Sequence, residues 1–347
     1  MSKLLLAVIL AVSVPVVSMA GAEDKGMQVL PNCAKRRVVI TFNGHAFTSY
    51  IWPATLKKPT IYPLIAPGGI IVSRGFPLEP RPGERVDHPH HAGLWFNYGN
   101  VNGFDFWNNS DAIKPEDREK MGSIRHEHIV SAKNGPTSAE LVVELVWTTG
   151  KGQDLLKETT RFVFQHRANA NIIDRETTLT ALDRAVFNDD KEGMLGMRVA
   201  HFLESADEKG GLFLDASGRP SKVENIDTTG ATGVYLTSEG KQAEAAWGTR
   251  GRWCMLTGKS GDQPVTVAIF DHPANPGYPT YWHARGYGLF AANPLGDSIF
   301  DPKAPAHNFT IEKGARATFR YRVVFYSHTA TAEEANKESS DFSAEYK

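Results

Sequence analysis

The 347-residue sequence is poor in cysteine, has no excess of charge of either sign, and has no long apolar run after its first twenty residues. Its 38 Lys and Arg residues nearly balance its 39 Asp and Glu residues. Because no net field would attract polyanions, we expect no nucleic-acid partner, and carbohydrate or another small polar ligand suits this balance better. No later run approaches the roughly 20 apolar residues of a membrane helix, so we expect no membrane insertion.

The two cysteines, Cys33 and Cys254, leave two alternatives open. An exported chain could join them in one disulfide, or both could be buried thiols. The sequence also lacks the G-x-S-x-G, H-E-x-x-H, P-loop and dinucleotide-binding patterns, so serine hydrolases with a nucleophile elbow and nucleotide-dependent enzymes fit poorly. Nothing in the sequence predicts an oligomeric state.

Residues 1–20 have the features of a secretory signal peptide. A lysine near the start precedes a short apolar run, and Ser18-Met19-Ala20 provides small residues for cleavage. We therefore expect a periplasmic or secreted protein. Its mature part, residues 21–347, is expected to form a single domain.

Alternating apolar residues dominate the chain and predict strands. Leu141, Val143, Leu145 and Trp147 share one side of such a run, and the 31 glycines and 20 prolines separate the runs as turns. The expected strands are 37–42, 139–147, 160–165, 171–180, 197–203, 265–270 and 319–326. Thr331 is a plausible N-cap for a helix over 332–337. The pattern predicts a mainly β protein, a large antiparallel β-sandwich with a short C-terminal helix.

The segment D87-H-P-H-H91 holds three histidines within four positions. Pro89 stiffens it, and in an extended chain His88 and His90 share one face while His91 points to the other, so the three converge only if the chain bends. A metal site of His88, His90 and His91, joined by His272 or His283, is thus an alternative and not the favoured interpretation. Proton transfer by His90 and His91 is favoured.

Two further segments carry polar and aromatic side chains suited to a ligand site. Trp95 and Trp107 follow the histidines and offer flat surfaces on which sugar rings stack. The glycine- and proline-rich stretch 270–296 is expected to be a long loop that packs beside the histidines as the other wall of a cleft. Its candidate residues are His272, Trp282, His283, Arg285, Tyr287 and Asn293. Glu192, before the run that holds Arg198, is either a base or a solvated turn acid.

Several blocks in order resemble the PmoA-like family of exported bacterial proteins of unknown function. The blocks are 61–69, 74–83, 87–95, 101–107, 191–193 and 278–294. The family's methane-oxygenase label is not adopted, because such a subunit is an integral membrane protein and the mature chain has no span. The β-rich pattern is also similar to the galactose-mutarotase-like supersandwich. That resemblance implies acid–base roles at a sugar ring for His90, His91 and Glu192.

Together these features predict an exported carbohydrate-active enzyme, an epimerase, lyase or glycosidase. His90 or His91 would be the acid and Glu192 or His283 the base, with an arginine, Arg198 or Arg285, pairing with an oxyanion or carboxylate. Trp95, Trp107 and Trp282 would stack on the sugar. A non-catalytic glycan-binding module and a metal-dependent oxidoreductase or hydrolase remain alternatives. No cofactor is favoured, and a divalent metal stays open.

Overall fold

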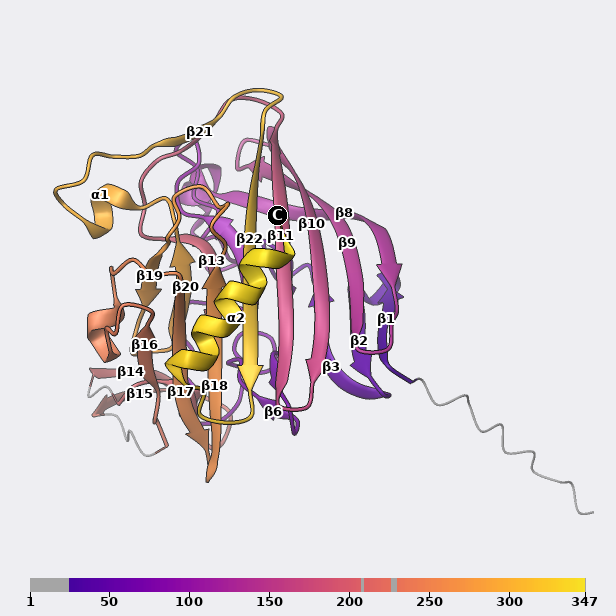
Figure 1. The fold of residues 1–347 in the computed structure, drawn as a ribbon. Coiled ribbons are helices and arrows are strands. Elements are labelled where there is room, and N and C mark those ends of the chain that lie inside the picture. The colour runs from indigo at the N-terminus through magenta and orange to yellow at the C-terminus, as the bar shows by residue number, and fades with distance from the viewer. Residues whose placement is uncertain (1–24, 207–208, 226–229, 347) are drawn as a thin grey trace, which may run out of the picture.

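The computed structural model describes residues 25–206, 209–225 and 230–346, so the expected signal peptide lies outside the described residues. In these ranges, two eight-stranded antiparallel sheets face each other and form a sandwich (Figure 1). The predicted large antiparallel β-sandwich is therefore confirmed. Within the described part of the chain, no helix has the length and apolar character needed to cross a membrane.

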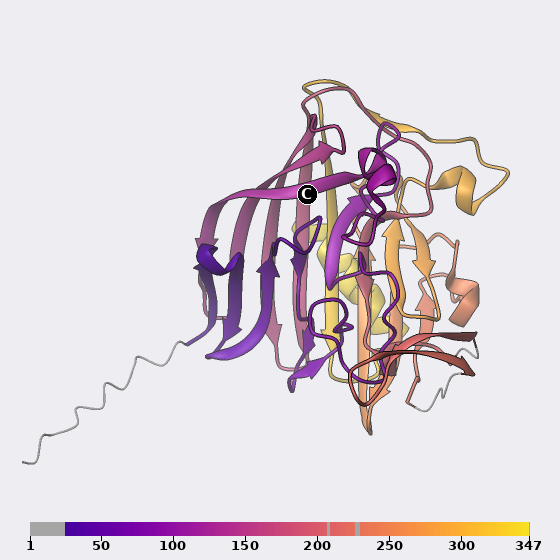
Figure 2. The same ribbon diagram turned by 180° about the vertical axis from the view of Figure 1, so that it is seen from behind.

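The first sheet combines the beginning of the chain with short strands from its middle and end. Its spatial order is β1-β2-β3-β4-β7-β13-β20-β19. In that order the bounds are Met27–Asn32, Arg37–Phe42, His45–Ile51, Thr60–Ile61, Leu94–Tyr98, Gly193–Arg198, Leu289–Asn293 and Tyr281–Ala284. Seen from behind, this sheet and the loops that follow β4 lie in front (Figure 2). The strands β7, β13 and β20, which are far apart in the sequence, are thus neighbours in this sheet.

The second sheet contains the long strands that the alternating pattern predicted. Its order is β16-β17-β18-β22-β11-β10-β9-β8. The bounds in that order are Val234–Thr237, Trp253–Ser260, Gln263–Asp271, Arg316–Tyr326, Ala170–Ala181, Asp154–Arg167, Ser138–Thr149 and Gly122–Lys133. On β9 the side chains of Leu141, Val143, Leu145 and Trp147 are all buried, as their period of two requires.

Smaller elements connect and cover the two sheets. Three two-stranded ribbons pair β5 (Ile65–Ala66) with β6 (Ile70–Ile71), β12 (Ala185–Phe187) with β21 (Phe309–Ile311), and β14 (Lys209–Leu214) with β15 (Pro220–Asn225). Short helices are η1 (Cys33–Lys35), η2 (Pro115–Lys120), η3 (His201–Leu203), η4 (Ala243–Ala246) and α1 (Asp297–Phe300). The last element is α2, Ala332–Glu345.

Helix α2 lies across the outer face of the second sheet (Figure 1). Thr331 caps it in a capping box with Glu334, which confirms the predicted start. Phe342 and Ala335 of the helix contribute to an apolar cluster with outward-facing residues of β11, β17, β18 and β22. The main core fills the space between the two sheets. On the outer face of the first sheet, the residues that the structure describes form loops, such as those that follow β4 (Figure 2).

Three local expectations need correction. The stretch 270–296 is not one long loop, because it contains β19 and β20, which pair with each other and continue the first sheet. The run expected as a strand over 197–203 contributes only its start to β13, and η3 follows. Cys33 is exposed, Cys254 is buried, and both are free, so neither the disulfide nor a pair of buried thiols is present.

Candidate functional site

The candidate site lies on the outer face of the first sheet, where β7, β13, β20 and β19 are neighbours. Trp95, Gly196, Ala291 and His283 are aligned across these four strands in register, so their side chains share this face. A Cβ at Gly196 would lie 2.8 Å from atoms of both Trp95 and Trp107. The glycine therefore leaves room for both indole rings, which pack edge to face with planes 69° apart.

The histidine segment bends sharply at His88, whose φ is 45°. This left-handed conformation supplies the bend that convergence requires. The ring centroids of His88 and His91 lie 5.0 Å apart with planes 4° apart, and those of His90 and His91 lie 4.3 Å apart, edge to face. His91 stacks in turn on Trp95 at 5.1 Å. The rings of His88 and His91 are thus stacked, and the ring of His90 packs edge to face against both.

Asp87 fixes this segment through two buried arginines. Its Oδ1 accepts hydrogen bonds from Arg74 Nη1 at 2.7 Å and from Arg198 Nη2 at 2.8 Å. Arg74 also donates to the backbone carbonyls of Asp87, His88 and His91, which holds the bend in place. Burial opposes ionisation of Asp87, but the His88 hydrogen bond and the two guanidinium groups outweigh it and lower its pKa below the usual range.

His90 and His91 are both held in the neutral state. Burial, with further lowering by the Lys58 charge, brings the pKa of His90 to about 2. Burial also lowers the pKa of His91 well below its ordinary value. The Nε2 atom of His91 lies 3.2 Å from the donor Trp107 Nε1, and its Nδ1 lies 3.3 Å from Arg198 Nη1. Neither ring is charged near neutral pH, so neither is suited to act as an imidazolium acid.

His88 is the accessible histidine of the segment. Its side chain is 43% exposed, and its Nδ1 lies 3.1 Å from Asp87 Oδ2. A carboxylate that binds one imidazole nitrogen orients the ring and leaves the other nitrogen for a reacting proton. From the sequence alone, His88 was a candidate only as a metal ligand. The aspartate directly before it was the signal that could have assigned it this role.

A second polar cluster contains Glu192, His283 and Arg285. His283 Nδ1 donates to the backbone carbonyl of Lys191 at 2.9 Å, and its Nε2 accepts from Arg285 Nε at 3.2 Å. Because burial also lowers the pKa of His283 to about 3, this histidine is a neutral support with both nitrogens in use. Glu192 differs, since its Oε2 is buried without a hydrogen-bond partner and burial raises its pKa. The environment of Glu192 therefore favours proton transfer.

Tyr287, in the turn between β19 and β20, connects the two clusters. Its ring stacks on His88 with centroids 5.6 Å apart, and the Arg198 guanidinium lies over it at 4.7 Å. Burial raises the pKa of Tyr287, and the charges of Arg198, Glu192, Arg285 and Asp87 act on it as well. The expected contact between the 270–296 stretch and the histidine segment is thus present.

A sequence model for a family of unknown function, DUF6807, matches residues 37–340. The chain belongs to the DUF6807 family. The matched range contains every block on which the resemblance to PmoA-like proteins rests, and the description of the DUF6807 family names no activity. None of the curated proteins matches the chain by sequence.

Solved structures similar to this DUF6807 chain share little sequence with it. A galactose 1-epimerase from Lactobacillus acidophilus NCFM is 12% identical with a TM-score of 0.36, over 87% of this chain and 98% of that one. A galactose mutarotase related enzyme from Lactobacillus acidophilus is 9% identical with a TM-score of 0.28, over 88% and 99%. An α-galactosidase from Geobacillus stearothermophilus is 13% identical with a TM-score of 0.35, over 81% of this chain and 39% of that one.

Other candidates of the sequence analysis lie elsewhere in the DUF6807 fold. Trp95 and Trp107 are on the site face but fully buried, so they support His91 and offer no open stacking surface. Trp282 belongs to the core between the sheets. His272 lies against Phe342 of α2. Asn293 is buried and bonds the backbone of residues 190 and 295.

The arrangement of the three histidine rings can be compared with that expected of metal ligands. In the part of the chain that the structure describes, no group of three or more His, Cys, Asp or Glu side chains is arranged to hold a metal ion. His88, His90 and His91 present ring faces and edges to one another instead of aiming nitrogens at one point. Metal ligands need converging nitrogens, so this arrangement gives the metal interpretation no support.

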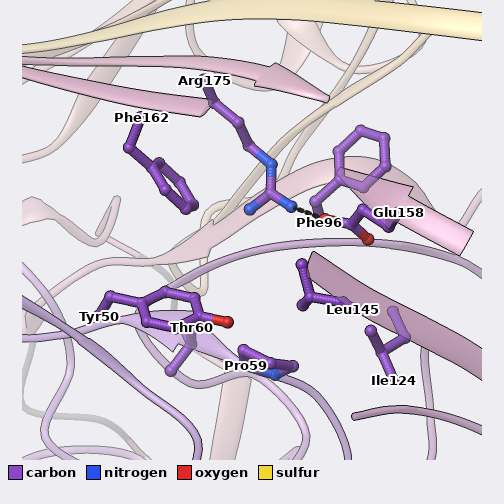
Figure 3. Close-up of a pocket in the computed structure, with 9 residues that line it drawn as sticks. All are labelled: Tyr50, Pro59, Thr60, Phe96, Ile124, Leu145, Glu158, Phe162 and Arg175. Atoms are coloured by element: carbon purple, nitrogen blue, oxygen red, sulfur yellow. Dashed lines mark hydrogen bonds and ion pairs between the residues drawn. The ribbon is translucent and has the colours of Figure 1, made fainter. Parts of the chain in front are cut away.

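A hollow between the two sheets is distinct from this site (Figure 3). Arg175 points across it to Glu158, and the two form an ion pair of 2.6 Å. Glu158 also accepts from Trp147 Nε1 at 2.7 Å and from Thr160. The other residues that line it are Tyr50, Pro59, Thr60, Phe96, Ile124, Leu145 and Phe162. Because both ends of the pair are buried and satisfied, the hollow is part of the core.

Proposed function

We propose that this protein is an exported carbohydrate-active enzyme in which His88 and Glu192 transfer protons at a sugar ring. The observation that carries the proposal is that Tyr287 stacks on an oriented, accessible histidine and also feels the charge of Glu192, a carboxyl with a raised pKa. Pairs of titratable groups in contrasting environments mark acid–base sites. Tyr287 and the neighbouring arginines would bind the sugar between them.

The chemistry that suits these groups is proton transfer at or next to the anomeric carbon. In its simplest form, one group removes the proton of the anomeric hydroxyl while the other protonates the ring oxygen, which opens the ring and allows the other anomer to form. Elimination and glycoside cleavage use the same pair of roles. Asp87 would orient His88 throughout, and Arg198 would stabilise negative charge near Tyr287. His90 and His91 would position the loop and not exchange protons.

Activity is tested with a panel of reducing sugars and chromogenic glycosides. Anomer interconversion is followed by NMR, and cleavage by product release, for the wild type and for His88→Ala and Glu192→Gln. Each variant should lose about 100-fold or more of its turnover with little change in melting temperature. His128→Ala is a matched control, because that histidine is exposed on β8. It should retain full turnover.

Three results would replace this proposal. Sugar binding without turnover in the wild type would favour a non-catalytic glycan-binding module. Stoichiometric metal, with activity lost on chelation, would favour the metal-dependent alternative. Full turnover in both His88→Ala and Glu192→Gln would remove the assigned roles. Export is tested separately by sequencing the N-terminus of the secreted or periplasmic protein, which should begin near Gly21.

A further inference from the structure

A groove lies beside the histidine segment, between the end of β3, the residues that follow it and the start of β8. We call it the Trp52 groove. The residues that matter here are Arg36, Trp52, Lys57, Lys58, Arg125 and His126. None of the residues that line it is an Asp or a Glu. No part of the proposed catalytic pair lies in it.

The indole of Trp52 is held in place at one wall of the groove. It stacks on His126 with ring centroids 4.0 Å apart and planes 29° apart. His126 is itself fixed by a 3.0 Å hydrogen bond between its Nδ1 and the hydroxyl of Tyr50. Burial lowers the pKa of His126 to about 4, so the stack is uncharged near neutral pH. A partly exposed and pre-oriented indole is the kind of surface on which a sugar ring stacks.

Cationic side chains line the same groove. Lys57 pairs with Asp111, and Arg125 pairs with Glu127 and Asp154, in contacts that are largely open to solvent. The single contact of Lys57 with Asp111 is of the exposed kind that contributes little, whereas Arg125 is held by a bidentate pair with Asp154. Arg36 is exposed and forms no ion pair with any residue that the structure describes. Its guanidinium is therefore free to bind a carboxylate in a bidentate manner.

The groove leads toward the histidine segment. A smaller hollow shares Leu56, Lys57 and Lys58 with it and extends to His90. Lys58 is buried, and its Nζ donates to the backbone carbonyl of His90 at 2.9 Å. The Nε2 atom of His90 is buried without a partner, on a side chain that is 9% exposed. Burying a polar atom unpaired is costly, and His90, which carries this atom, lines the hollow that adjoins the groove.

We infer that the Trp52 groove binds an acidic oligosaccharide, one of whose sugar rings stacks on Trp52 while its carboxylates pair with Arg36 and Lys57. The chain would run across Lys57 and Lys58 toward His90. This assigns a second binding surface to the protein and does not require that the site at Tyr287 be catalytic.

The test is calorimetric titration of the mature wild-type chain with a galacturonate tetramer, and with maltotetraose as a neutral chain of equal length. Trp52→Ala and Arg36→Gln should each weaken binding of the galacturonate tetramer by about tenfold or more. Lys35→Gln is the matched control, since it removes the same charge from the neighbouring exposed residue outside the groove. It should change the affinity by less than about twofold. Raised salt should also weaken binding.

Equal affinity for maltotetraose and the galacturonate tetramer would overturn the inference, and so would no binding of either. An equal effect of Arg36→Gln and Lys35→Gln would reduce it to general charge attraction and also overturn it. Glu192→Gln separates this inference from the proposed function. That variant should bind the galacturonate tetramer like the wild type, whatever its turnover. Melting temperatures of all variants show that any loss of binding is local.

Discussion

Replacing Asp87 with asparagine should both destabilise the fold and disorder the candidate site. The carboxylate lies between Arg74 and Arg198, whose side chains are 1% and 0% exposed, while its own side chain is 29% exposed. Removing one partner of a fully buried ion pair costs about 3–5 kcal/mol. Partial exposure and the remaining amide oxygen reduce this cost. We therefore expect Asp87→Asn to lower the free energy of unfolding by about 2–3 kcal/mol.

The loss of unfolding free energy caused by Asp87→Asn should depend on pH. The folded pKa of Asp87 is depressed, so its contribution to stability is fully present above its unfolded pKa, near about 4, and is lost as the pH falls toward the folded value. The difference in unfolding free energy between wild type and Asp87→Asn should thus be constant from about pH 6 to 8 and shrink below about pH 4.

Urea denaturation followed by far-UV circular dichroism measures this difference across the pH range. Asp111→Asn is the control, because Asp111 also pairs with a cation but its side chain is 65% exposed. It should cost less than about 1 kcal/mol. A loss for Asp87→Asn no larger than that of Asp111→Asn, or a loss that grows as the pH falls from 6 to 4, would refute the reasoning.

Two further predictions concern the core and the thiols. Glu158→Gln leaves Arg175 buried without its charge partner and should lower the free energy of unfolding by about 3 kcal/mol in urea titration. Glu312→Gln, in an exposed ion pair, should cost less than about 0.5 kcal/mol, and equal losses would contradict the core role of Glu158. A thiol reagent should label Cys33 in the native protein and Cys254 only after denaturation, whereas labelling of neither in the native state would point to a disulfide.

The parts of the fold that the sequence predicted are those in which one strand face is buried. In β9, apolar residues alternate from Leu141 to Trp147 because one face of the strand packs on the core. A period of two in the sequence is therefore enough to predict this strand. The start of helix α2 could be predicted from Thr331 because a capping box is a local sequence signal. Strands β19 and β20 could not be predicted from the sequence, because all of their residues are buried and glycine and proline surround them. Their pairing with each other and with β13 is a property of the tertiary fold.

The candidate site, too, could be predicted from the sequence only in part, because its geometry depends on the tertiary fold. The density of histidine and aromatic residues drew attention to 87–107 and to Tyr287, and the structure brings His88 and Tyr287 into contact. The left-handed backbone of His88 accompanies a bend in which the rings of His88 and His91 stack, whereas alternation in an extended chain places these two rings on opposite faces. The contact of Asp87 with Arg74 and Arg198 requires the bend in the chain and the position of β13, which carries Arg198. A local sequence pattern predicts neither of them.

The central claim is that Glu192 and His88 exchange protons with a sugar, and the pH dependence of turnover tests it most directly. Burial raises the pKa of Glu192, so activity that needs its carboxylate should fall on the acid side at a higher pH than for an ordinary glutamate. The measurement is the pH–rate profile of anomer interconversion for wild type and Glu192→Gln. The account predicts that Glu192→Gln lowers the rate about 100-fold and abolishes this acid limb. An unchanged rate and profile in Glu192→Gln would contradict it.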